Sequence, residues 1–137
     1  MPTTEIEPKV KTVLLQEKIF YGTLKGLHEA GGILRRQEAM AWIETNVVFT
    51  EWELAYATEE SKYPRWRSTL TFQLVGLVKA KFMEKTKEGW KITSKGVEVL
   101  EKSSPSELRD MTVQLYSEWY KEDKEMELAT QSQTVGF

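Results

Sequence analysis

The stretch from Tyr63 to Leu100 restricts the fold of this chain more than any other part of the sequence. Apolar residues recur in its first half at intervals of three and four, which places them on one face of a long helix over residues 65–81. A polar turn around Gly89, between two short segments, then predicts a hairpin, and Thr93 predicts the cap of another helix through Leu100. A helix followed directly by a small hairpin is the order of elements in a winged helix.

Length and composition limit the remaining possibilities. The chain has 137 residues, enough to bury the core of one domain with an additional element. It has no cysteine, which excludes disulfides and thiolate metal sites. The first residues lack the pattern of a signal peptide, and no apolar run is long enough to span a membrane. We therefore expect a cytoplasmic protein.

The net charge of -2 conceals an uneven distribution of charged residues. Residues 1–61 contain six Lys and Arg against ten Asp and Glu, and residues 103–137 contain three against seven. Residues 62–102 contain ten against four, a net charge of +6. A local basic surface indicates a polyanionic partner better than the net charge of the chain does. A solvated charged surface is the alternative interpretation.

The chain in order predicts a mainly α fold with a small β wing: a winged helix-turn-helix plus a C-terminal helix. Gly31 and Gly32 end a first helix, residues 33–34 form a minimal strand, and a second helix runs from Arg35 to about residue 46. Capping patterns begin further helices at Thr50 and at Ser104. We expect a flexible arm over 1–11, a winged-helix domain over 12–102, a C-terminal helix over 103–128 and a disordered tail over 129–137.

Several residues of the basic stretch resemble the N-terminal winged-helix domain of Mrr-type restriction endonucleases. The resemblance covers roughly residues 15–102 and includes the acidic capping segment 49–53, the basic and aromatic helix 65–81 and a Gly-x-Trp-x-Ile-Thr signature. Gly89, Trp90, Ile92 and Thr93 form that signature, with Gly96 close behind. The sequence departs from the family at Lys81, where the family usually has glycine, and at Phe72, where it often has tryptophan. The resemblance implies DNA binding by this domain, with cleavage carried out by a separate nuclease domain.

A DNA-binding domain of this kind would place the long helix in the major groove and the hairpin along the backbone or in the minor groove. Arginine and lysine are suited to both contacts, because they neutralise phosphates and arginine also pairs with guanine. The candidate DNA-binding residues come from the long helix, the hairpin and the start of the second helix: Arg65, Arg67, Ser68, Thr71, Lys79, Lys85, Lys87, Lys91, Arg35 and Arg36.

Aromatic residues at helical spacing are usually core residues, and we interpret Trp42, Trp52, Trp66 and Trp90 in this way. Phe72 points away from the apolar stripe of its helix. It could meet a base or a ligand, but we expect the segment 50–58 to cover it.

The helix that begins at Pro105 carries a second apolar stripe, which must be buried against something. Its residues are Leu108, Met111, Leu115 and Trp119. The stripe could pack on the first helix, form a dimer with a second copy, or lead into another domain.

Nothing in the sequence indicates catalysis, a metal site or a cofactor. His28 is the only histidine, and no adjacent serine or cysteine accompanies it. We expect a module that binds double-stranded DNA, the recognition part of a restriction-type, possibly modification-dependent, system. Its further partners would be a second copy of the chain or a nuclease domain or subunit. The alternatives are a dimeric transcriptional regulator and a winged helix that binds another protein.

Overall fold

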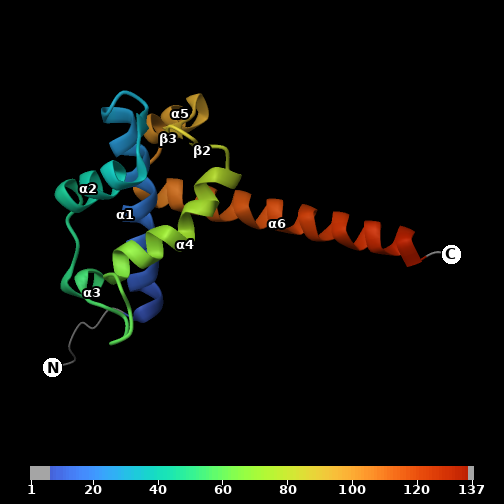
Figure 1. The fold of residues 1–137 in the computed structure, drawn as a ribbon, viewed down its shortest axis with the longest axis horizontal. Coiled ribbons are helices and arrows are strands. Elements are labelled where there is room, and N and C mark those ends of the chain that lie inside the picture. Colours follow the sequence, from blue (N-terminus) through green and yellow to red (C-terminus); the bar gives the residue numbers. More distant parts are fainter. Residues whose placement is uncertain (1–6, 136–137) are drawn as a thin grey trace.

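Helix α1 (Pro8–Glu29) is the element on which most of the others pack, as the computed structural model of the chain shows (Figure 1). The structure describes residues 7–135, and the side chains of residues 7–129. α1 begins at Pro8 because proline is well suited to the first helical position. The prediction of a flexible arm is therefore wrong for residues 8–11, which are helical, while residues 1–6 lie outside the described part.

The buried face of α1 explains its central position. Its core residues follow one another at intervals of one, three and four: Leu15, Ile19, Phe20, Leu24 and Leu27 are each at most 1% exposed. The helix ends as predicted, because Gly31 and Gly32 have positive φ and donate to the carbonyls of His28 and Leu27.

Two short helices and one long helix follow. Helix α2 (Arg36–Asn46) buries Ala39, Met40 and Ile43, and α3 (Glu51–Leu54) has the predicted capping box between Thr50 and Glu53. Helix α4 (Arg65–Lys79) packs against α1, α3 and α6. Of the predicted apolar stripe, Trp66, Leu70, Leu74 and Leu77 are buried and Val78 is partly buried.

A three-stranded antiparallel sheet closes one end of the domain. Strands β1 (Ile33–Leu34), β2 (Met83–Thr86) and β3 (Gly89–Ile92) lie in the order β1-β3-β2. Side chains alternate along β3, so Trp90 and Ile92 enter the core and Lys91 stays exposed. We call the β2–β3 hairpin the wing.

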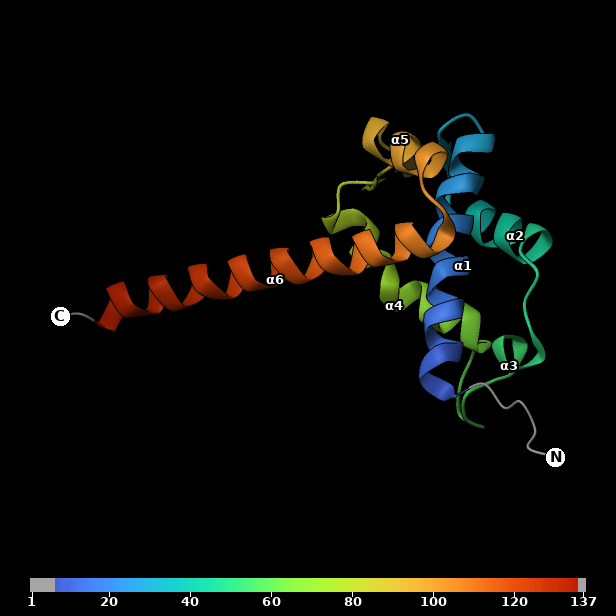
Figure 2. The same cartoon turned by 180° about the vertical axis from the view of Figure 1, so that it is seen from behind.

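Helix α5 (Ser94–Lys102) follows the sheet, and helix α6 (Pro105–Val135) ends the chain. The first part of α6 packs on α1 and α4, and the rest projects away from the domain (Figures 1 and 2). Residues 129–135, predicted as a disordered tail, belong to α6, and residues 136–137 lie outside the described part. The predicted fold class, mainly α with a small β wing and a C-terminal helix, is confirmed. None of the helices in the described range has the length and apolar character needed to cross a bilayer.

Candidate functional site

The outward face of α4 is exposed and uncharged at its centre. Ser68, Thr71, Phe72 and Val75 lie on this face, and Phe72 is 80% exposed. The prediction that the segment 50–58 covers Phe72 is therefore wrong. That segment contacts the beginning of α4, where the amide of Arg65 donates to the carbonyl of Ala55.

The three cations of α4 lie at its periphery, each over an aromatic ring. The Arg65 guanidinium lies 4.3 Å from the Trp52 ring centre and donates to the Trp52 carbonyl. The Arg67 guanidinium lies 4.2 Å from the Tyr63 ring centre. Cations attract the negative face of an aromatic ring, so these contacts orient the side chains and limit their reach.

Lys79 has the same kind of contact with a more distant part of the chain. Its Nζ lies 4.3 Å from the ring centre of Trp119, which belongs to α6. The two polar residues predicted on α4 remain accessible, although the Thr71 hydroxyl donates to the Arg67 carbonyl within the helix. The contacts of Lys79 and Arg65 join residues far apart in the sequence, and helical periodicity alone could not have predicted them.

The wing exposes its three predicted lysines, but they do not share one face. In the register of the hairpin, Lys85 is opposite Trp90 and Glu84 is opposite Lys91. Directly opposed residues point to the same side of a sheet. Lys91 therefore shares its face with Glu84, while Lys85 lies on the face of Trp90 and Lys87 lies in the turn.

The arginine pair at the start of α2 lies beside the wing. Strand β1 pairs with β3, so that Leu34 is opposite Trp90 and Arg35 follows immediately. A Cβ atom on Gly89 would lie 2.5 Å from the Leu34 carbonyl oxygen and 3.1 Å from the Arg35 nitrogen, which shows how closely the two backbones approach. Arg35 and Arg36 are both exposed.

We call the two arginines and the three wing lysines together the basic edge. It consists of Arg35, Arg36, Lys85, Lys87 and Lys91.

Thr93, which ends the Gly-x-Trp-x-Ile-Thr signature, and Gly96 behind it have a structural role. The Thr93 hydroxyl donates to the Lys81 carbonyl at 2.6 Å and accepts from the Gly96 amide at 3.0 Å. A Cβ on Gly96 would lie 2.1 Å from the Phe82 carbonyl oxygen. These residues hold α5 against the start of β2, which explains their types without a ligand.

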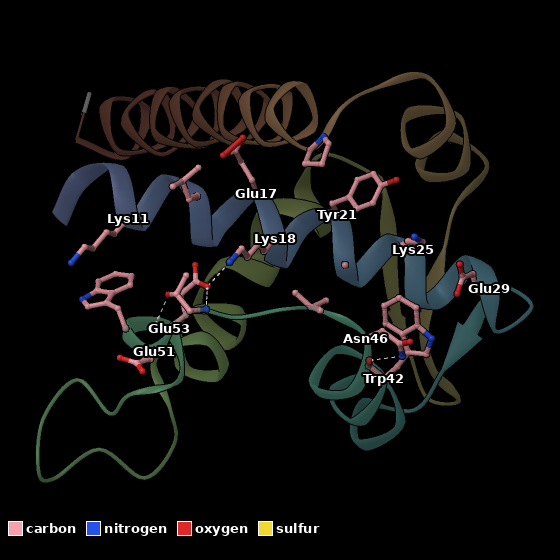
Figure 3. Close-up of a pocket in the computed structure, with 16 residues that line it drawn as sticks. Lys11, Glu17, Lys18, Tyr21, Lys25, Glu29, Trp42, Asn46, Glu51 and Glu53 are labelled. Atoms are coloured by element: carbon pink, nitrogen blue, oxygen red, sulfur yellow. Dashed lines mark hydrogen bonds and ion pairs between the residues drawn. The ribbon is translucent and has the colours of Figure 1, made fainter. Parts of the chain in front are cut away.

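A groove of about 900 Å³ runs along α1, between this helix on one side and helices α2 and α3 on the other (Figure 3). Lys11, Lys18 and Lys25 lie along it at intervals of seven residues, which is two helical turns. Their ammonium groups lie 5.7, 5.9 and 6.0 Å from the ring centres of Trp52, Phe49 and Tyr21, respectively. Trp42 and Trp52, predicted as core residues, are only partly buried and line this groove.

The charges of the groove are mixed. Glu53 is 2% exposed, lies 2.6 Å from the Lys18 ammonium and accepts from the Thr50 amide at 2.8 Å. Glu17, Glu29 and Glu51 also line the groove, so its four glutamates outnumber its three lysines. A polyanion would be repelled by such a set. The spacing of Lys11, Lys18 and Lys25 on α1 is a sequence signal for this groove.

The apolar stripe of α6 packs inside the chain. Leu108 is fully buried, and Met111 and Leu115 pack against the same core. Trp119 lies under Lys79 and beside Tyr116, with a ring-centre distance of 5.7 Å to the latter. Of the three possibilities for this stripe, the structure therefore shows packing on the chain's own helices α1 and α4.

The family model of the Mrr N-terminal domain matches residues 17–102, well over half of the chain. No curated protein and no solved structure matches this chain. The matched range begins within α1, ends with α5, and contains α4, the wing and the basic edge. Within residues 7–129, no three His, Asp or Glu side chains are grouped so that they could hold a metal ion.

Proposed function

Because the chain belongs to the Mrr N-terminal domain family, we propose that it is the duplex DNA-binding module of an Mrr-type restriction system. The family membership associates the chain with such systems, and the matched region is the family's N-terminal domain and not its catalytic part. We further propose that the protein is located in the cytoplasm and that its partner, besides DNA, is a nuclease domain or subunit.

The basic edge is the observation that carries this proposal. Strand pairing between β1 and β3 brings Arg35 and Arg36 beside the wing, whose lysines are far from them in the sequence and lie on different faces of the hairpin. Helix α4 contacts β2, the strand that carries Lys85. Lysine and arginine side chains at such an edge would neutralise phosphates and release their counterions. The uncharged centre of α4 would then face the base edges in the major groove. Phosphate contacts would position the domain and α4 would read the bases.

The three peripheral cations of α4 have a narrower role in this arrangement. Arg65, Arg67 and Lys79 are oriented by aromatic rings, so we assign them to phosphates that flank the helix. A guanidinium keeps its charge and its outer N–H donors while it is stacked on a ring.

The dependence of DNA binding on salt tests the proposal. We expect binding of a mixed-sequence duplex to weaken by orders of magnitude between about 50 and 200 mM salt if six or more phosphates are contacted. In the triple variant Lys85→Gln, Lys87→Gln, Lys91→Gln, the slope of log K against log salt should decrease by about 0.9 for each phosphate contact removed. Fluorescence anisotropy with a labelled duplex measures both quantities.

A matched triple variant controls for the loss of three charges. Lys9, Lys121 and Lys124 are exposed and lie outside the basic edge. Their substitution by glutamine should leave the slope near that of the unsubstituted protein. Failure of the unsubstituted protein to retain duplex at low salt, or binding that does not depend on salt, would rule out the proposal.

A further inference from the structure

Among the large apolar side chains in the helices of residues 7–129, that of Phe72 is the most exposed. It is 80% exposed at the centre of the outward face of α4, between Ser68 one turn before it and Val75 one turn after it. The phenyl group gains little from the folded state in this position, because burial is what makes an apolar side chain stabilising. The phenyl group is therefore available for a contact outside the chain.

The surroundings of Phe72 restrict the chemistry of that partner. Ser68 and Thr71 give the face two hydroxyl groups, and Val75, 39% exposed, adds a second apolar side chain. Arg67 and Lys79 flank the face toward the two ends of the helix. Val113 and Tyr116 of α6 line the same small cavity as Phe72 and Val75. The face thus combines an apolar centre with hydroxyl groups and positive charge around it.

Duplex DNA presents the complementary pattern in its major groove. Phosphates line both sides of the groove, base edges offer donors and acceptors, and the 5-methyl group of thymine is the apolar feature of an unmodified base pair.

We propose that Phe72 contacts the 5-methyl group of thymine and makes the domain prefer sequences with thymine at that position. This inference rests on the proposed function, because it requires α4 to enter the major groove. Burial of one methyl group corresponds to about a fourfold change in Kd. Phe72 is thus a residue that selects the sequence, while the basic edge supplies the affinity common to all sequences.

Two pools of random-sequence duplex test this inference, one made with thymine and the other with uracil, which lacks the methyl group. We expect the unsubstituted protein to bind the thymine pool about fourfold more tightly for each methyl contacted. Phe72→Ala should bind both pools equally, with the affinity of the unsubstituted protein for the uracil pool. Because Phe72 is exposed, this variant should fold normally, and Phe72→Leu should keep part of the preference.

Leu14→Ala provides the control. Leu14 is 42% exposed on α1, where it lines the groove and not the outward face of α4, so this variant should keep the full thymine preference. Equal binding of the two pools by the unsubstituted protein would overturn the inference while leaving the proposed function intact. A preference that survives in Phe72→Ala would also overturn it. If no duplex is bound at low salt, the proposed function fails and the inference fails with it.

Discussion

Lys81 has a backbone conformation that normally belongs to glycine. Its φ is +70°, and within the described part of the chain no other residue except glycine has a positive φ. Lys81 and Phe82 donate to the carbonyls of Val78 and Leu77, the pair of hydrogen bonds that ends a helix through a left-handed residue. Glycine adopts this conformation without the steric cost that a side chain adds.

Lys81→Gly should therefore stabilise the protein. A residue other than glycine in the left-handed region costs about 1–2 kcal/mol, and the greater entropy of unfolded glycine offsets part of the gain. We expect a net increase of about 0.5–1 kcal/mol in the free energy of unfolding, measured by urea denaturation. Lys85→Gly, in a strand without a positive φ, should reduce stability, and a loss of stability in Lys81→Gly would contradict this explanation.

Gly96 is required by a close approach and not by its own φ. A Cβ at this position would lie 2.1 Å from a backbone carbonyl oxygen, whereas a Cβ on Gly76 would lie 3.2 Å from the methyl group of Thr112. A backbone atom cannot move aside as a side chain can.

We expect opposite tolerance at these two glycines. Gly96→Ala should destabilise the protein by about 2–3 kcal/mol, despite the higher helix propensity of alanine. Gly76→Ala should change stability by less than about 1 kcal/mol, because overpacking against the methyl group offsets the gain in propensity. Thermal denaturation of the two variants compares these effects, and equal losses would show that the carbonyl contact is unimportant.

At the scale of single elements, the start of α6 has a helix cap to which an ionisable group, the carboxyl group of Glu107, contributes. The Ser104 amide donates to the Glu107 carboxylate at 3.0 Å, and the Glu107 amide donates to the Ser104 hydroxyl at 3.1 Å. Hydrogen bonds from the Ser104 backbone, and then from its side chain, lower the pKa of Glu107 below its ordinary value of 4.5.

The stabilising effect of Glu107 should therefore depend on pH. Because the pKa is lower in the folded state, the contribution is complete above the unfolded pKa and is lost as pH falls through the folded value. The difference in Tm between the unsubstituted protein and Glu107→Ala should be present near pH 7 and should shrink as the pH falls below 4.5 and through the lower folded-state pKa. Glu101→Ala, in an exposed position of α5, serves as the reference for charge removal alone. A difference that stays constant across this range would exclude the cap as its source.

The elements that the sequence predicted are those whose signals are local. Gly31, Thr50, Thr93 and Ser104 each mark a helix end through hydrogen bonds to residues at most a few positions away. The short sheet was also predictable, because the hairpin and its Gly-x-Trp-x-Ile-Thr signature are contiguous.

Features that depend on tertiary contacts could not be predicted in this way. The position of Lys79 over Trp119 and the exposure of Phe72 depend on where α3 and α6 cross α4. The groove depends on the separation between α1 and α2. The ten candidate DNA-binding residues remain predictions. The structure adds that Arg35 and Arg36 lie beside the wing, and that the three cations of α4 each lie over an aromatic ring.

At the scale of the whole molecule, the folded unit extends beyond the region that matches the family. The match ends at residue 102, but Leu108 and Thr112 of α6 are at most 1% exposed, and Gly76 of α4 leaves room for Thr112. We therefore propose that the first half of α6 is part of the domain and that only the projecting half is separate.

Two leucines on the same helix test this boundary. Leu108→Ala should lower the free energy of unfolding by about 2–5 kcal/mol, since it removes a fully buried side chain from the core. Leu128 is 63% exposed on the projecting half, and its substitution by alanine should change the value by less than about 0.5 kcal/mol. Denaturation in urea measures both. A small effect at Leu108 would place the whole of α6 outside the folded unit.

The pairing of β1 with β3 has a consequence for the order in which the molecule forms. Residues 33–34 can pair only when residues 90–91 are in place, whereas α1, α2 and the hairpin form through contacts between residues close in the sequence. Closing so long a loop costs entropy before any contact offsets it, so this pairing belongs to the late steps of folding. During synthesis, the arginine pair emerges long before the hairpin lysines. The basic edge is thus completed only after the chain has been made through the end of the sheet.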